Sequence, residues 1–387
     1  MEMSAFLNLV LQPCGELCNL DCDYCYVHSM SQSENPKSPS HAANVFSAWF
    51  PALLRKINEL SIKMVRFTWH GGEPMLQPQE FFQHMVQLQN KLLRTDLARD
   101  NVLMTNGTLL NSKTVPLLSK LGISIGVSCD GPLIEHNISR VRSELEFNQI
   151  MSGFGALKGH GVDFSVVIVV NRHNLLATND LVKMIIQLNP RFGVSITPCF
   201  GAEVSPSQQE YATFLKGLYE AWKPKKQPAI SLFKNIERGL SFEPPAFCQL
   251  TGGKCGSFIT VRYNGDLYTG CQVEQPYRIG NIASESISDM LAVHKRNVRL
   301  LENSLKNPTL YEFLCTEEYL YFQGRGCPFR QIESRDQYAP AIAELIEHVY
   351  RSDSARFDTA RAFKMEKLLK AGNGYEQECC AKANNDY

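Results

Sequence analysis

The sequence predicts an α/β protein whose first half is a partial (β/α)6 TIM barrel and whose second half is a smaller domain of a β-hairpin and helices. Three observations lead to this prediction. Strand-like and helix-like segments alternate six times between residues 6 and 197. Polar and glycine-rich stretches follow the predicted strands, at the end that carries the active site in α/β barrels. Asn264-Gly265 separates two alternating runs further along, which is a strong hairpin signal.

Each of the six predicted strands is a short apolar run, and helical spacing of apolar residues follows it. The predicted strands cover residues 6–11, 62–68, 101–104, 124–128, 164–170 and 193–197. The predicted helices between them cover residues 42–60, 78–94, 112–121, 145–159 and 176–188, and residues 29–40 read as a loop. Six units in place of eight predict an incomplete barrel with a lateral opening.

Composition excludes several classes of protein. A chain of 387 residues with 44% hydrophobic and 20% charged residues is typical of a globular protein of two or three domains. Lys plus Arg and Asp plus Glu both number 39, so we expect neither a nucleic-acid nor a membrane partner. No secretory signal and no apolar run of about 20 residues is present. We therefore expect a cytoplasmic protein whose thirteen cysteines remain thiols or bind metal.

The most informative stretch directly follows the first predicted strand. Cys18, Cys22 and Cys25 form a C-x3-C-x2-C triplet, with the aromatic Tyr24 before the last cysteine. Three thiolates this close in sequence can hold three irons of a cubane iron–sulfur cluster and leave the fourth iron open to a small molecule. A zinc site normally uses paired C-x2-C units, so this spacing fits zinc poorly. An odd number of cysteines within eight residues argues against disulfides.

Three later strand ends carry residues that can contact a ligand. They are Gly71-Gly72-Glu73-Pro74, Thr105-Asn106-Gly107 and Ser128-Cys129-Asp130. Two adjacent glycines allow a close approach of the backbone to a ligand, and a carboxylate accepts hydrogen bonds from an amine. Each stretch alone also fits an ordinary turn or helix cap. Their repetition at successive strand ends favours a binding site.

These motifs together resemble the radical S-adenosylmethionine (SAM) superfamily, and more closely the branch of anaerobic sulfatase-maturating enzymes and maturases of ribosomally made peptides. The resemblance covers about residues 5–335 and implies a 4Fe–4S cluster that binds SAM. Reductive cleavage of SAM would yield a 5′-deoxyadenosyl radical that abstracts a hydrogen from the substrate. The resemblance also implies that a set of residues contacts the cofactor, namely Tyr24, Gly71, Gly72, Glu73, Asn106, Ser128, Asp130 and Arg140. Arg140 is the weakest candidate among them.

The second half resembles the auxiliary-cluster domain of the same enzymes, called SPASM when complete and twitch when shortened. Four cysteines match the ligands of its first auxiliary cluster, namely Cys248, Cys255, Cys271 and Cys327. The second cluster's ligands are missing apart from Cys315, so we predict one auxiliary 4Fe–4S cluster. Cys315 is then a leftover buried thiol or an alternative ligand. A zinc ribbon also uses a hairpin, so zinc remains an alternative for the four cysteines.

We predict three parts of the chain from these patterns. Residues 1–235 form the barrel, residues 236–337 the auxiliary cluster domain, and residues 338–387 a helical tail that packs on the protein or binds a partner. Cys379 and Cys380 lie in that tail and are assigned no role.

Gln272 bears on the reaction. In sulfatase maturases the residue after the third ligand of the auxiliary cluster is an aspartate that acts as a base, and a carboxamide cannot replace it in this role. Glu274 is a possible substitute. Our leading prediction is therefore a radical SAM maturase that crosslinks a precursor peptide through a cyclophane C–C bond or a thioether, with a flavodoxin or ferredoxin as electron donor. The alternatives are a sulfatase-maturating enzyme that converts Ser or Cys to formylglycine, and a non-catalytic iron–sulfur or zinc protein.

Overall fold

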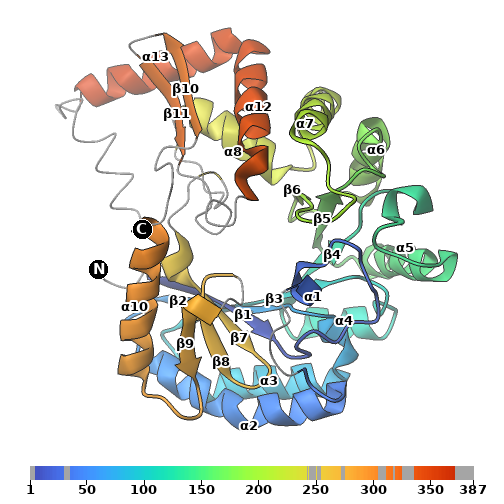
Figure 1. The fold of residues 1–387 in the computed structure, drawn as a ribbon, viewed down its shortest axis with the longest axis vertical. Coiled ribbons are helices and arrows are strands. Elements are labelled where there is room, and N and C mark those ends of the chain that lie inside the picture. The colour runs from blue at the N-terminus through green and yellow to red at the C-terminus, as the bar shows by residue number, and fades with distance from the viewer. Residues whose placement is uncertain are drawn as a thin grey trace. The chain divides into compact units, whose positions relative to one another are not determined.

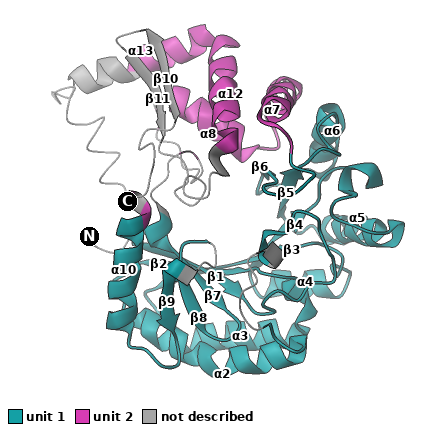
Figure 2. Cartoon of the chain, in the orientation of Figure 1, with its two compact units in different colours: residues 1–205, 255–300 teal, residues 206–254, 301–387 magenta. Residues whose placement is uncertain are grey.

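A computed structural model describes residues 5–29, 35–241, 254–271, 275–303, 311–316, 319–324 and 335–370, together with residues 243 and 250. The chain forms two compact units (Figure 2). Unit 1 contains Met1–Ser205 and Cys255–Leu300, and unit 2 contains Pro206–Lys254 and Leu301–Tyr387. This division differs from the three predicted parts of the chain, whose boundaries remain a prediction.

Unit 1 is built on six parallel strands in the spatial order β6-β5-β4-β3-β2-β1 (Figure 1). The strands are β1 (Phe6–Gln12), β2 (Met64–Trp69), β3 (Ala98–Thr105), β4 (Ile123–Ser128), β5 (Phe164–Val170) and β6 (Val194–Pro198). The helices are α1 (Tyr26–Ser29), α2 (Pro39–Asn58), α3 (Gln79–Leu92), α4 (Thr114–Lys120), α5 (Glu144–Gly159) and α6 (Thr178–Leu188), with short 3-10 helices η1 (Pro74–Leu76) and η2 (Ile134–Asn137). The predicted partial barrel is confirmed.

The start of α2 differs from the prediction. It begins at Pro39, three residues before the predicted start, because the Ser38 hydroxyl accepts a hydrogen bond of 3.1 Å from the His41 amide. Pro39 occupies the first helical turn, where its missing N–H leaves no hydrogen bond unmade. The predicted loop over residues 29–40 is shorter by this turn.

The two faces of the strands differ in polarity. Val65, Phe67 and Trp69 of β2 are fully buried, and their alternation with half-exposed neighbours has the period of two expected for a strand. Trp69 packs against Phe46, Phe50 and other rings of α2 and α3, and burying each such ring contributes roughly 1.5–3 kcal/mol. The opposite face is half-exposed on β2 to β6 and carries polar side chains among apolar ones, namely Thr68, Ser124, Ser128, Ser165, Ser195 and Thr197 on β2, β4, β5 and β6. Polar side chains on this face leave it suited to a hydrated ligand.

The predicted hairpin is confirmed and belongs to unit 1. Strands β7 (Phe258–Arg262) and β8 (Asp266–Thr269) pair antiparallel, and Gly265 adopts a φ of +86° in the turn between them. β7 also pairs in parallel with β1, so that with β9 (Arg278–Asn281) the sheet has nine strands. Helix α10 (Ile287–Asn303) follows this hairpin. The hairpin thus continues the barrel sheet.

Unit 2 is mainly helical. It contains α7 (Gln208–Trp222), α8 (Ser231–Leu240), α12 (Ala339–Arg351) and α13 (Ser354–Lys370), together with an antiparallel pair β10 (Tyr311–Thr316) and β11 (Tyr319–Gly324). The buried Glu237 carboxylate of α8 joins α7 and α13, because it accepts a hydrogen bond from the Tyr219 hydroxyl and forms ion pairs with Lys226 and Arg356. The predicted helical tail therefore packs on α7 and α8 within this unit.

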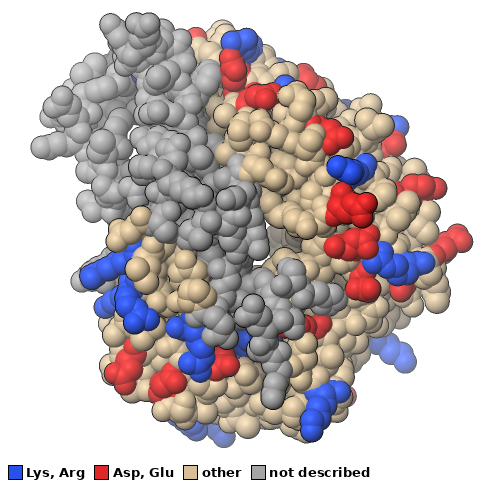
Figure 3. Space-filling model, viewed as in Figure 1, with Lys and Arg blue, Asp and Glu red and all other residues tan. Residues whose placement is uncertain are grey.

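The described surface shows no single dominant charge. Acidic and basic side chains are interspersed on the face seen in Figure 3. Within the part of the chain that the structure describes, no helix is both long enough and apolar enough to cross a bilayer.

Candidate active site

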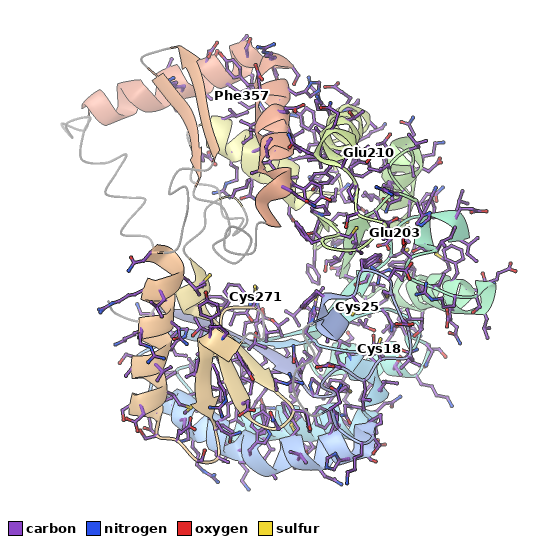
Figure 4. All side chains as sticks on the ribbon, viewed as in Figure 1. Cys18, Cys25, Glu203, Glu210, Cys271 and Phe357 are labelled. Carbon is purple, nitrogen blue, oxygen red and sulfur yellow. The ribbon has the colours of Figure 1, made fainter. Side chains whose placement is uncertain are left out.

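The cysteine triplet lies on the loop between β1 and α1, which we call the cluster loop (residues 13–25) (Figure 4). Its three thiols are half-buried and form no disulfide. The Leu20 amide donates to the Cys18 sulfur at 3.4 Å, and the Cys25 amide closes a turn on the Cys22 carbonyl at 3.0 Å. Burial raises the pKa of Cys22 to about 12, and the charges of Cys25 and Cys18 contribute to this rise. Iron bound by Cys22 would therefore have to displace its proton.

A cubane distributes its cysteine ligands over separate irons, so the three thiols need not converge on one point. Among the described residues, no group of three His, Cys, Asp or Glu side chains is already arranged to hold a single metal ion. The assignment of Cys18, Cys22 and Cys25 to a 4Fe–4S cluster stays a prediction.

Gly71 and Gly72 follow β2 and pack against the backbone of the cluster loop. The Gly72 amide donates to the Gly15 carbonyl, and the Glu73 amide to the Leu17 carbonyl, both at 2.9 Å. A Cβ on Gly72 would lie 2.0 Å from the Leu17 carbonyl oxygen, and Gly71 has a φ of +105°. The glycines are therefore required by contact between two segments of the protein, whereas the sequence suggested close approach to a ligand.

Glu73 is buried at the end of β2 and lies beside β3. Its carboxylate accepts hydrogen bonds from the Met75 amide at 2.9 Å, the Thr105 hydroxyl at 2.8 Å and the Asn106 amide at 2.7 Å. Burial nevertheless raises the pKa of Glu73 to about 7. A cationic amine placed beside this carboxylate would favour its charged form.

Asn106 connects the end of β3 to the cluster loop. Its side-chain amide donates to the Asn19 side chain at 2.9 Å and lies 3.8 Å from the Cys18 sulfur. The Thr108 hydroxyl donates to the Asn106 carbonyl oxygen at 2.7 Å and accepts from the Asn19 amide at 2.8 Å. This closed set of bonds fixes the loop around the first cysteine of the triplet.

Asp130, Tyr24 and Arg140 form one buried cluster of side chains. Both oxygens of the Asp130 carboxylate accept from Arg140, at 3.0 and 3.3 Å, while one also accepts from the Val169 amide at 3.0 Å and the other from the Tyr24 hydroxyl. The Arg140 guanidinium lies 5.6 Å from the centre of the Tyr24 ring. Asp130 has no exposed surface, so a direct contact with SAM, as the sequence suggested, would require one of these bonds to break.

A second set of contacts ties the same segment to the cluster loop. The Asp23 amide donates to the Ser139 carbonyl at 2.9 Å, and the Cys22 thiol to the Arg140 carbonyl at 3.5 Å. The nearby Ser128 hydroxyl is half-exposed at the end of β4 and bonds to none of the described residues. Of the predicted contacts on this side of the site, Ser128 is the one best placed to meet a ligand.

Two residues near the triplet were missed in the sequence. His70 is half-buried between β2 and the glycines, and its Nδ1 accepts from the Gly71 amide at 2.6 Å and lies 3.4 Å from the Tyr26 hydroxyl. Burial lowers the pKa of His70 to about 4, so this side chain is neutral near pH 7. The position of His70 directly before Gly71-Gly72 is the signal that could have identified it.

Tyr26 is the second of these residues, and it begins α1 directly after the triplet. Its side chain is 39% exposed, and its hydroxyl lies 3.4 Å from Nδ1 of His70. Cys271, a predicted auxiliary ligand, lies just beyond β8 at the same rim of unit 1 as Cys25 (Figure 4).

The structure describes two of the four predicted auxiliary ligands. Cys255 is buried in the 3-10 helix η3 (Lys254–Ser257), and Cys271 is exposed. The pairing of β7 with β8 brings the two turns together, since the Gly270 amide donates to the Phe258 carbonyl at 2.9 Å. Cys248, Gln272 and Cys327 lie outside the described residues, as does the side chain of Cys315. The auxiliary ligand set thus remains a prediction.

Comparisons with known proteins bear on the family and the fold of this chain. Residues 13–185 match the family model described as Radical SAM superfamily. The chain is 28% identical over 380 residues to a serine-type anaerobic sulfatase-maturating enzyme of Bacteroides thetaiotaomicron, covering 89% of this chain and 88% of the relative. It is 26% identical over 315 residues to a cysteine-type enzyme of Clostridium perfringens, covering 78% of this chain and 84% of that protein.

A solved structure supports the fold. Native anSMEcpe with bound AdoMet and Cp18Cys peptide superposes with a TM-score of 0.72 at 21% identity, covering 91% of this chain and 99% of that one. The predicted resemblance is confirmed at the level of the superfamily and the fold. For the reaction, the relatives favour the predicted alternative, sulfatase maturation, over the leading prediction of a peptide crosslink.

Proposed function

As the chain belongs to the radical SAM superfamily, we propose that it uses SAM to oxidise a Ser or Cys side chain of a peptide substrate to formylglycine. The observation that carries this proposal is the similarity to a serine-type sulfatase-maturating enzyme over 89% of the chain. The intact triplet and the buried Glu73 beside it supply the parts that such chemistry needs.

The residues of the site have separate tasks in this proposal. Cys18, Cys22 and Cys25 hold the cluster, which together with SAM supplies a 5′-deoxyadenosyl radical. Glu73 is the proposed contact for the amino group of SAM, which would have to reach a carboxylate that is 1% exposed. Ser128 offers a half-exposed hydroxyl for the nucleoside. The contacts among Tyr24, Asp130 and Arg140 keep the cluster loop in place. A fixed loop holds the reacting atoms in position.

Oxidation of a serine side chain must remove two hydrogens. One leaves the β-carbon as a hydrogen atom to the radical, and the hydroxyl proton passes to a base. The remaining electron passes to an acceptor, for which we propose one auxiliary 4Fe–4S cluster held by Cys248, Cys255, Cys271 and Cys327. A flavodoxin or ferredoxin would supply the electron that cleaves SAM.

A second candidate function is a crosslink within a precursor peptide, and Gln272 favours it. A carboxamide cannot act as the base that formylglycine formation requires. Cyclophane formation between an aromatic ring and a β-carbon still needs an electron acceptor when the ring regains aromaticity, so the auxiliary cluster serves both reactions.

Anaerobic reconstitution tests the proposal. The protein is loaded with iron and sulfide, reduced, and incubated with SAM and peptides that carry a central Ser or Cys. We expect about eight irons per chain, 5′-deoxyadenosine, and a product that reacts with a carbonyl reagent. A Cys18→Ala/Cys22→Ala/Cys25→Ala variant is the control and should form no 5′-deoxyadenosine.

The outcomes distinguish the candidates. A product that has lost two hydrogens but does not react with the carbonyl reagent, and whose fragmentation shows a closed ring, identifies crosslinking. About twelve irons per chain would contradict a single auxiliary cluster. Zinc without SAM cleavage would overturn the enzyme proposal.

A further inference from the structure

Helix α10 carries two buried polar side chains that face the β7–β8 hairpin. The His294 imidazole contacts the Gly256 carbonyl through Nε2 and the Thr269 hydroxyl through Nδ1, both at 3.1 Å. Asn297, one turn further along the helix, donates to the Thr269 hydroxyl at 3.3 Å and to the Arg278 carbonyl at 3.4 Å. One helix face thus contacts both ends of the hairpin.

The direction of each hydrogen bond follows from the partners. A backbone carbonyl can only accept, so Nε2 of His294 carries the proton and donates to Gly256. Nδ1 then accepts from the Thr269 hydroxyl, which in turn accepts from Asn297. Burial lowers the pKa of His294, in keeping with this neutral form. Each donor in this hydrogen-bond network thus meets an acceptor.

The network is fully buried in a region that is otherwise apolar. His294 is 2% exposed, and Thr269 and Asn297 have no exposed surface. Met290, Val298 and Leu301 of the same helix are buried beside them. Burying polar groups in such a region is unfavourable unless all of them are hydrogen-bonded. Apolar side chains at these positions would leave the Gly256 and Arg278 carbonyls without these donors, so the network serves the backbone that it contacts.

Two residues of the network's contacts, Gly256 and Thr269, lie close in sequence to predicted ligands of the auxiliary cluster. Gly256 directly follows Cys255, and Thr269 precedes Cys271 by two residues. Thr260 adds a further bond, because its hydroxyl donates to the Gly270 carbonyl at 2.9 Å. Both cysteine-bearing turns are therefore fixed from the side of α10 and β7.

We propose that His294, Thr269 and Asn297 are positioning residues that fix the Cys255 and Cys271 turns for binding of the auxiliary iron–sulfur cluster. This inference rests on the auxiliary cluster of the proposed function. Groups behind the ligands of a metal site commonly set ligand orientation, metal affinity and reduction potential. Of these three residues, His294 has the central place, since it contacts both turns.

The test uses the Cys18→Ala/Cys22→Ala/Cys25→Ala protein, in which only the auxiliary cluster can form. His294→Leu removes both bonds at similar volume, whereas His294→Gln retains a donor and an acceptor. Gln89→Leu is the matched control, because it breaks an equally buried pair with Asn101 on α3 and β3. Iron per chain, the electron paramagnetic resonance spectrum and reduction potential of the cluster, and thermal unfolding of the iron-free protein are measured for each variant.

We expect His294→Leu to reduce the amount of bound iron at least about twofold. The spectrum or the reduction potential of the remaining cluster should also change. His294→Gln should restore both, and Gln89→Leu should change neither, whatever its effect on thermal unfolding. Unchanged iron, spectrum and potential in His294→Leu would overturn the proposal, as would an equal loss of iron in Gln89→Leu.

A separate outcome concerns the premise. If the triple-alanine protein with His294 intact binds no iron, or binds a single zinc, the auxiliary cluster and this proposal both fail. SAM cleavage by the unmodified protein would still support the proposed radical chemistry, so the two failures are distinguishable.

Discussion

Gly72 lies so close to Leu17 that a Cβ on Gly72 would be 2.0 Å from the Leu17 carbonyl oxygen. The atom in the way is backbone, which cannot move without shifting the cluster loop. We therefore expect Gly72→Ala to displace the loop that carries Cys18 and to reduce bound iron from about eight to about four per chain. Iron analysis after anaerobic reconstitution measures this.

Gly155 provides the matched control for that substitution. A Cβ at this position in α5 meets nothing within 4 Å. Gly155→Ala should retain all the iron and stabilise the helix by about 0.5–1 kcal/mol. Full iron loading in Gly72→Ala would mean that the cluster loop tolerates the displacement and that the close contact is not essential.

A second prediction concerns pH and Glu73. Its pKa in the folded protein is raised to about 7, so the folded state holds a proton there that the unfolded chain releases near pH 4.5. The contribution of Glu73 to stability is then fully present below pH 4.5 and is lost as the pH rises through 7. Relative to Glu73→Gln, the iron-free protein should lose about 3 kcal/mol of unfolding free energy over this range.

Urea unfolding at several pH values measures this difference. Taking the difference between the two proteins removes the contributions of other groups, including the half-buried His70. SAM binding supplies an independent check, because a carboxylate with this pKa should bind the cationic amine more tightly at pH 8 than at pH 6. If the affinity for SAM depends on pH to the same extent in Glu73→Gln, the assignment of this pKa to Glu73 is contradicted.

The Asp130–Arg140 pair leads to a third prediction. Both side chains are almost fully buried, at 0% and 6% exposure. Asp130→Ala leaves the guanidinium without its partner and should cost about 3–5 kcal/mol of unfolding free energy. The double variant Asp130→Ala/Arg140→Met should lose less than Asp130→Ala alone, because the unpaired charge is gone. Strictly additive losses in urea unfolding would argue against coupling of the two groups.

The barrel could be predicted because its signal is local. Short apolar runs and the helical spacing between them predicted all six parallel strands of the barrel, and β5 has the predicted bounds. The cysteine triplet could also be predicted, because its three cysteines lie within eight residues. Helix α8 was missed because it has ten residues near several prolines, and the β10–β11 pair because its segment was assigned to cluster ligands.

What could not be predicted depends on contacts between distant segments. The need for glycine at position 72 arises from the backbone at Leu17, 55 residues earlier in the chain. Asp130 reads as a ligand contact in sequence, but the structure surrounds it with Arg140, Tyr24 and the Val169 amide. The pairing of β7 with β1 joins segments about 250 residues apart, and no local pattern indicates it.

The last prediction distinguishes the two candidate reactions through Gln272. If the enzyme forms formylglycine with a poor base, Gln272→Asp should supply the missing carboxylate and raise formylglycine yield by about 10²-fold, the lower end of the range for general base catalysis. Gln272→Asn is the control, since it shortens the side chain to the same length without adding a base. If Glu274 already acts as the base, Glu274→Gln would abolish formylglycine formation. Adding Gln272→Asp to that variant would then restore it. Quantitative mass spectrometry of Ser and Cys peptides measures each yield. Crosslinked product from all of these variants, with no formylglycine from Gln272→Asp, would assign the enzyme to peptide crosslinking.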